Sequence, residues 1–227
     1  MAKSALIKSS IAKKYWMALT GLFLCLFLVG HLLGNLQLIF GSSHDFNDYA
    51  LFMTTNPAVK ILSYLTYFSI LFHAIDGIAL TIQNKKARPI AYAKTNPAAN
   101  SGFASRNMAV LGTLILVFIV THMVNFWARM HFDKNMPLVT KEIPQMGNTQ
   151  LMAVGLPGFQ APFFPLDETG KLNAEIIKGN ELTQKDLTTV IDKDGFIIFK
   201  GQKDLYKITV DFFKNPQFGL IATLSYV

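Results

Sequence analysis

Three long apolar runs constrain this chain more than any other feature of its sequence. They cover residues 15–40, 59–82 and 108–128, and each has the length of about 20 helical residues that crosses the hydrocarbon core of a bilayer. Of the 227 residues, 51% are hydrophobic and only 15% are charged, which is too apolar for an ordinary soluble domain. We therefore expect an all-α integral membrane protein built as a bundle of transmembrane helices.

A shorter apolar run, PQFGLIATLSYV, begins at Pro216 and reaches Val227. About 12 residues are too few to cross a bilayer, so we expect the chain to stop inside a fourth membrane helix and to be incomplete. The predicted organisation is a transmembrane region over 1–132, an insert over 133–215 and the start of the fourth helix over 216–227. No signal peptide is expected, because the first run is too long and lacks a small-residue cleavage site.

The positions of the basic residues predict how the helices are oriented. The loop 41–58 carries no lysine or arginine and contains Asp45 and Asp48, whereas the N-terminus and the connection between the second and third spans are basic. These basic residues are Lys3, Lys8, Lys13, Lys14, Lys85, Lys86, Arg88, Lys94 and Arg106. Because cytoplasmic loops are enriched in such residues, we expect the N-terminus and the connection between the second and third spans to be cytoplasmic.

The net charge of +7 also comes from the basic residues of the transmembrane region. Residues 1–132 hold 11 lysines and arginines against three acidic residues, and the rest of the chain is nearly balanced. A nucleic-acid interface would instead need basic residues on one soluble face, interleaved with aromatic ones. We therefore predict no nucleic-acid partner, and we expect the cytoplasmic cations to attract an acidic soluble partner.

The insert is expected to face the periplasm. Its first part, over 136–170, is rich in proline and glycine and lacks helical periodicity, which predicts an ordered loop. The segments LTTVIDKDGFIIFKGQ and LYKITVDFF then predict short strands, with DKDG as a turn. Asp192 and Asp194 resemble the start of a calcium loop, but Lys203 stands where the bidentate glutamate is required, so we favour a hairpin turn.

Three of the five histidines lie inside the apolar runs, and their depths form a pattern. At 1.5 Å per residue, His31 lies about 22 Å into the first span and His122 about 21 Å into the third, both counted from the cytoplasmic side. Two histidines at one depth on different helices can bind the two axial faces of a single haem iron. His73 lies about 21 Å into the second span, which runs the other way, and this places it in the cytoplasmic half. A partner for it would lie on the fourth span, beyond Val227.

Glycines accompany these histidines. Gly30 and Gly34 bracket His31, and Gly77 follows His73 by one helical turn. Small residues would let a porphyrin approach the helix backbone, although GHLLG is also a helix-packing motif, and both interpretations stay open.

The remaining polar residues near the spans have more than one interpretation. Asp76 can hydrogen-bond within the membrane, lie near a haem propionate or belong to a proton path. His44 and His131 are expected to be solvated at the rims. Cys25, the only cysteine, is interpreted as an apolar filler, and the absence of CxxCH means that any haem is not covalently attached.

Three segments together carry a resemblance to a known family. They read MALTGLFLCLFLVGHLLGNLQLIFG, LFHAIDGIALTIQNKKARP and SRNMAVLGTLILVFIVTHMVNFW, and FKNPQFGLIATLSYV is similar to the start of a fourth helix. Over residues 5–130 the chain resembles the dihaem cytochrome b subunit of succinate dehydrogenase and fumarate reductase, the cytochrome b558 type. In that family one five-helix polypeptide binds two haems b through four histidines. It passes electrons between flavoprotein and iron–sulfur subunits and a quinone such as menaquinone.

The resemblance implies roles for particular residues. His31 and His122 would ligate the distal haem iron, and His73 would be one ligand of the proximal haem. The second proximal ligand and the fifth helix are not in this chain, and the insert is longer than the family usually has. The chain would hold no catalytic residue, because the dicarboxylate chemistry belongs to another subunit.

Two other classes of function remain open from the sequence. One is a haem-free membrane transporter or anchor, in which the three histidines and Asp76 form a polar relay. The other is a carrier, in which the insert binds a periplasmic partner and the helices only hold it in the lipid.

Overall fold

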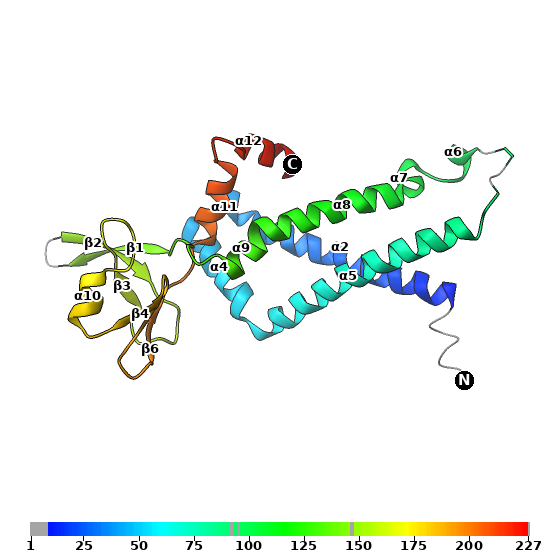
Figure 1. The fold of residues 1–227 in the computed structure, drawn as a ribbon. Helices are drawn as coiled ribbons and strands as arrows, with labels where there is room; N and C mark the ends of the chain where they lie inside the picture. The colour runs from blue at the N-terminus through cyan, green and yellow to red at the C-terminus, as the bar shows by residue number, and fades with distance from the viewer. Residues whose placement is uncertain (1–8, 91–92, 95, 146–147, 227) are drawn as a thin grey trace, which may run out of the picture. The chain divides into compact units, whose positions relative to one another are not determined.

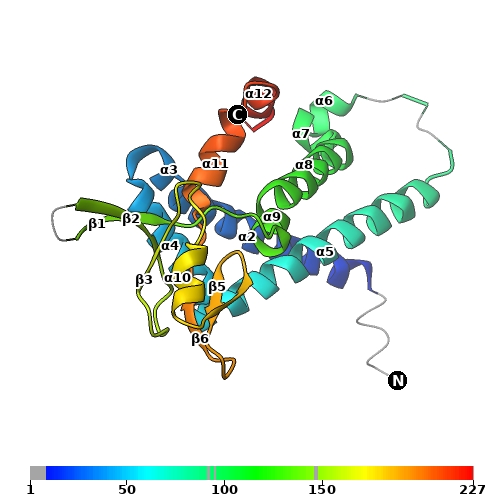
Figure 2. The same cartoon turned by 60° about the vertical axis from the view of Figure 1, so that its left-hand side comes forward.

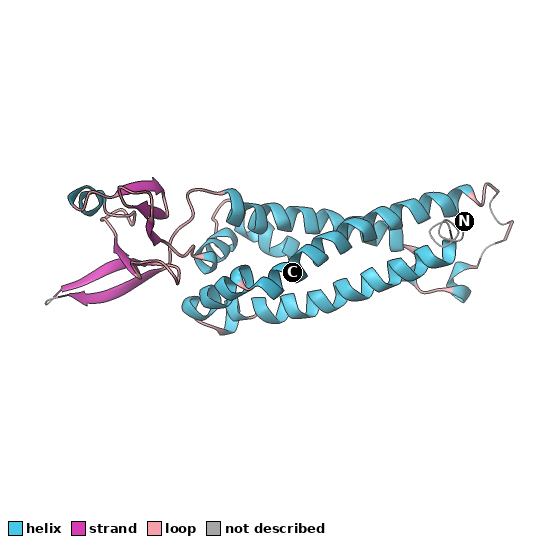
Figure 3. Cartoon of the chain, turned by 90° about the horizontal axis from the view of Figure 1, so that it is seen from below, coloured by secondary structure: helices cyan, strands magenta, loops and turns pink. Residues whose placement is uncertain are grey.

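The computed structural model describes residues 9–90, 93–94, 96–145 and 148–226, so Lys3 and Lys8 of the predicted cytoplasmic cluster lie outside the described residues. The described chain is mostly helical and also contains two small sheets (Figures 1 and 3). It divides into two compact units. The helical unit comprises residues 1–36 and 53–125, and the mixed unit comprises residues 37–52 and 126–227.

Within the residues that the structure describes, three helices are long and apolar enough to span a membrane, over Ile11–Phe40, Pro57–Lys86 and Met108–Phe132. The first consists of α2 (Ser10–Asn35) and α3 (Gln37–Phe40), and the second is α5 (Pro57–Lys86). The third consists of α8 (Met108–His122), a π-helix η1 (Met123–Ala128) and α9 (Arg129–Phe132). Two short helices, α6 (Pro97–Asn100) and α7 (Phe103–Arg106), precede it. The prediction of three membrane-length helices is therefore confirmed.

Among the described residues of the helical unit, the buried side chains are mostly small and polar, with Leu80 also buried, and most large apolar side chains are exposed. Helix α5 packs against both α2 and α8. The buried polar residues of this unit are Thr20, Thr66 and Ser69, and the Thr66 hydroxyl donates to the Leu62 carbonyl oxygen at 2.9 Å. Small residues let membrane helices approach closely. Large side chains such as Leu33 and Leu114 are more than 60% exposed, which suits lipid rather than water.

The mixed unit contains two antiparallel three-stranded sheets, ordered β1-β2-β3 and β4-β5-β6. The first consists of β1 (Thr140–Gln145), β2 (Asn148–Val154) and β3 (Phe163–Pro165). The expectation that residues 136–170 form only loop is therefore wrong. Pro144 lies in the edge strand β1, where the missing N–H is tolerated.

The second sheet confirms the predicted hairpin. It consists of β4 (Thr183–Asp186), β5 (Thr189–Ile191) and β6 (Ile197–Lys200), and DKDG connects the last two strands. Gly195 in this turn has a φ of 87°, a conformation that favours glycine. The Asp192 carboxylate accepts the backbone N–H groups of Asp194 and Phe196, so it acts as a turn residue.

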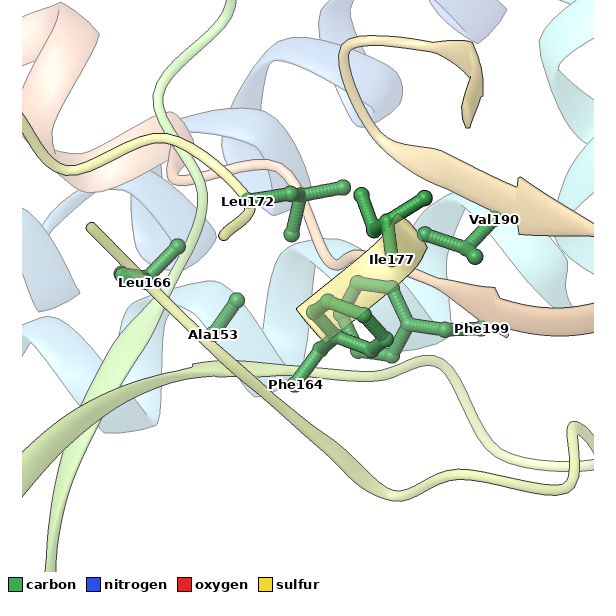
Figure 4. Close-up of a cluster of buried hydrophobic side chains, with 7 residues drawn as sticks. All are labelled: Ala153, Phe164, Leu166, Leu172, Ile177, Val190 and Phe199. Carbon is green, nitrogen blue, oxygen red and sulfur yellow. The ribbon is translucent and has the colours of Figure 1, made fainter. Parts of the chain in front are cut away.

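The two sheets and the short helix α10 (Ala174–Gly179) share one apolar core. Phe199 and Val190 are fully buried in it, and Phe164 packs on Phe199 with ring centroids 5.3 Å apart (Figure 4). The other members of the cluster are Ala153, Leu166, Leu172 and Ile177. A Cβ added at Gly155 would lie 2.7 Å from the Ala161 carbonyl oxygen, so this position requires glycine.

Two further expectations are corrected in the mixed unit. The loop 41–58 contains the helix α4 (Ser43–Thr55), and LYKITVDFF forms the helix α11 (Leu205–Phe213) rather than a strand. Asn47 of α4 explains the second result, because its side-chain oxygen accepts from the backbone N–H groups of Leu205 and Tyr206 at 2.9 and 3.1 Å. Asp204 accepts from Lys207 N–H at 2.8 Å. Three of the four N–H groups that open a helix are thereby satisfied.

The fourth apolar run forms the helix α12 (Gly219–Tyr226), which follows α11 in Figure 2. Asn215 precedes it, and its side-chain oxygen accepts from the backbone N–H groups of Gln217 and Phe218. The predicted helical start at Pro216 is therefore observed three residues later.

Candidate functional site

The structure brings His31 of α2 and His122 of α8 together inside the helical unit. Their ring centroids are 5.7 Å apart and the ring planes stand at 86° to each other. The two residues are 91 positions apart in the sequence, and only the arrangement of two separate helices places them side by side. This agrees with the equal depths counted from the sequence.

Each of these histidines stacks on an aromatic ring one turn earlier in its own helix. Phe27 lies 5.4 Å from His31, and Phe118 lies 5.8 Å from His122, both with ring planes 21° apart. The same Phe-x3-His spacing occurs in both segments of the sequence, but the sequence analysis did not predict that these phenylalanines contact the histidines. Stacking against a ring fixes the plane of an imidazole, so the two phenylalanines orient the histidine pair.

The backbone next to the pair is also specialised. Helix α8 ends at His122, and the π-helix η1 begins at the next residue. Such π-helical segments are rare and occur frequently at functional sites. On the other helix, the Asn35 amide donates to the His31 carbonyl oxygen at 2.7 Å. The amide nitrogen also lies 3.4 Å from His31 Nε2. No sequence signal that we used indicated the π-helix.

His73 of α5 lies apart from this pair, against a different part of α2. Its Nδ1 atom is 3.1 Å from the Thr20 hydroxyl oxygen, and its ring lies beside Gly21. Gly21 precedes His31 by ten residues, which is about 15 Å along a helix. The three histidines therefore occupy two levels, with His31 and His122 at one and His73 at the other.

The predicted glycines differ in their surroundings. A Cβ added at Gly30 would meet nothing within 4 Å, because Gly30 is exposed on α2. Gly34 is buried. A Cβ at Gly77 would lie 3.2 Å from the terminal methyl carbon of Met17, so Gly77 contacts α2 directly and serves helix packing.

The other polar candidates lie at the surface or stand apart. His44 is exposed and lies 3.5 Å from Asp48, and His131 stacks on Trp127 with centroids 4.4 Å apart. Asp76 is half-buried on α5, one turn after His73, and Cys25 is exposed.

Asp45 belongs to a helix cap rather than to a free loop. The Ser42 hydroxyl and backbone N–H both donate to its carboxylate, at 2.6 and 3.1 Å, and the Asp45 N–H donates to the Ser42 hydroxyl at 3.1 Å. These bonds form a reciprocal capping box at the start of α4. The Ser42 side chain, followed by its backbone, lowers the pKa of the Asp45 carboxyl below its usual value.

Comparison with known protein families, characterised proteins and solved structures finds no match to this chain.

Proposed function

We propose that this chain is the membrane-anchoring cytochrome b subunit of a succinate:quinone oxidoreductase, and that it passes electrons between an iron–sulfur subunit and a quinone. The observation that carries the proposal is the His31–His122 pair. The two rings come from different membrane-length helices, and their centroids are 5.7 Å apart. The resemblance of the three histidine-containing segments to the dihaem cytochrome b family supports the same function. Succinate or fumarate chemistry would reside on the flavoprotein subunit.

The residues present fit haem b. The donor set is imidazole, which is the ligand type of haem irons with two histidine ligands, and the two rings come from different helices. Apolar side chains surround the pair along α2 and α8, and they would provide the low dielectric that such a group occupies in cytochromes.

The chain's own residues would position the group and keep water from it. Haem b, when bound, supplies one-electron transfer. His31 and His122 would hold the group through their imidazoles, and a haem held by two histidines would supply electron transfer rather than oxygen chemistry. Phe27 and Phe118 hold the two imidazole planes through ring stacking. His73 would serve a second haem.

The partners follow from the charge of the helical unit. It contains ten lysines and arginines against a single acidic residue, Asp76. Most of these cations are at the ends of the three spans, where they would dock an acidic face of the iron–sulfur subunit. Under this proposal the protein resides in the bacterial inner membrane with its N-terminus in the cytoplasm, and menaquinone or another quinone is the electron-transfer substrate.

A reduced-minus-oxidised absorbance spectrum of the purified full chain tests the proposal. We expect the Soret and α bands of haem b in the parent protein and in a His44→Ala control, whose substituted histidine is exposed. In His122→Ala the absorbance of the haem held by the pair should disappear. A parent protein without haem bands would contradict the proposal and favour the haem-free polar relay, which tolerates His31→Gln.

A further inference from the structure

The contact between Thr20 and His73 crosses from α2 to α5 and is protected from solvent. Thr20 is only 5% exposed, and its hydroxyl oxygen lies 3.1 Å from His73 Nδ1. The same hydroxyl oxygen lies 3.0 Å from the Trp16 carbonyl oxygen and 3.1 Å from the Met17 carbonyl oxygen. The hydroxyl therefore has three possible partners and a single proton.

The position of that proton follows from the chemistry of the three partners. Carbonyl oxygens only accept hydrogen bonds, whereas a neutral imidazole nitrogen either donates or accepts. A helical threonine commonly donates to the carbonyl oxygen three or four residues earlier. When Thr20 does so, its lone pairs remain to accept a hydrogen bond, and His73 Nδ1 must be the donor.

We propose that Thr20 is a positioning residue that fixes His73 as the Nδ1–H tautomer and so presents the lone pair of Nε2 to a metal. Within the residues that the structure describes, no hydrogen bond reaches His73 Nε2. A metal-binding histidine usually donates its other ring N–H to an acceptor, which fixes the tautomer and raises the basicity of the ligand. The inference deepens the proposed function, on which its metal-binding part rests.

Gly21 leaves the space on α2 that the His73 imidazole occupies. A Cβ added at Gly21 would lie 3.1 Å from His73 Cε1, which is tighter than ordinary van der Waals contact, and 3.7 Å from Nδ1. The imidazole is rigid and is already hydrogen-bonded to the preceding residue. A methyl group at position 21 would therefore push the ring away from Thr20.

Nitrogen NMR of the histidines in the full chain, prepared without haem in lipid nanodiscs, tests the tautomer directly. We expect the His73 Nε2 signal of the parent protein at the shift of an unprotonated nitrogen and the Nδ1 signal at that of a protonated one. Thr20→Ser should preserve this pattern, whereas Thr20→Val should shift His73 toward the Nε2–H tautomer. A matched control is Thr113→Val on α8, because the Thr113 hydroxyl donates to the Ala109 carbonyl oxygen at 2.8 Å. An Nε2–H tautomer in the parent protein would overturn the proposal, and so would an unchanged pattern in Thr20→Val.

A redox titration of the haem-loaded complex separates this inference from the proposed function. Loss of the hydrogen bond from Nδ1–H makes the imidazole a weaker donor to ferric iron, so Thr20→Val should raise the midpoint potential of one haem. Thr20→Ser and Thr113→Val should leave both potentials in place. Haem present with potentials that Thr20→Val does not move would contradict the inference and leave the proposed function intact. A parent protein without haem would contradict the proposed function, and the NMR result would still decide the tautomer.

Discussion

The helical unit and the mixed unit of this chain have opposite interiors. In the helical unit the buried polar side chains are hydroxyls such as Thr20 and Thr66, while leucines and valines are exposed. In the mixed unit Phe199 and Val190 are fully buried, and the surface carries 11 basic and 13 acidic residues across its sequence. The contrast indicates two solvents, because burial of apolar groups drives folding in water but contributes little between helices in lipid.

The largest difference should appear when a large apolar side chain is truncated in each unit. Phe199→Ala should destabilise the mixed unit by about 3–5 kcal/mol, because it leaves a cavity in a closed core. Leu114→Ala, at a side chain that is 61% exposed on α8, should leave the stability of the helical unit unchanged. Hydrogen exchange with increasing denaturant measures both effects, at the β4–β6 amides for Phe199→Ala and at the α8 amides for Leu114→Ala. Equal losses of protection in the two variants would refute the contrast.

A lysine introduced at an exposed apolar position should have the larger effect in the helical unit. Val117 is 57% exposed near the middle of the third membrane-length helix, so Val117→Lys should cost about 3 kcal/mol of membrane insertion. Phe196 is 71% exposed on the hairpin turn, and Phe196→Lys should have almost no effect on stability. The inserted fraction in a glycosylation-mapping assay measures the first effect, and hydrogen exchange of the β5 and β6 amides measures the second. If Val117→Lys inserts as well as the parent, α8 does not face lipid at this position.

The mixed unit should also depend on a single buried amide. Asn47 is 3% exposed, and it donates to the Asp204 carboxylate at 2.9 Å while accepting from two N–H groups of α11. Asn47→Ala leaves these groups without their partner and should destabilise the unit by about 2 kcal/mol. Asn180→Ala removes an exposed amide that donates to the Ile176 carbonyl oxygen and is the control. Equal stability of the two variants would show that α11 does not need the Asn47 cap.

The smallest effect should be a pH dependence at the start of α4. Because hydrogen bonds from Ser42 lower the pKa of the folded Asp45 carboxyl, this cap stabilises the helix above the unfolded pKa of about 3.9. The contribution is lost as the pH falls through the lowered folded pKa. Carbon NMR of the carboxyl should show an Asp45 midpoint below the usual range, and Ser42→Ala should raise it. A midpoint that the substitution leaves unchanged would contradict the capping box.

The sequence predicted features that local hydropathy determines. The three spans follow from the lengths of apolar runs, and the level positions of His31 and His122 follow from counting residues along two helices that run in the same direction. The DKDG hairpin also carries its own signal, since Gly195 supplies the positive φ. These features need no information about distant parts of the chain.

Other features depend on partners far away in the sequence, and the sequence reading missed them. LYKITVDFF has the β-branched composition of a strand, but Asn47, more than 150 residues earlier, caps it as a helix. The strands β1 and β2 lie in a proline- and glycine-rich stretch, and they become strands because they pair with each other. The contacts of His73 with Thr20 and Gly21 depend on the packing of α5 against α2. Long-range contacts of this kind override local propensity.

Haem quantitation by pyridine haemochrome in His31→Ala, His122→Ala and the double variant tests the central claim most directly. If the two histidines bind the same iron, each single variant should lose one equivalent of haem relative to the parent, and the double variant should lose no more than either single one. Such complete non-additivity is expected of residues that act as one unit. A double variant that loses two equivalents would place the two histidines on separate haems, and three variants with the parent's haem content would show that neither binds haem.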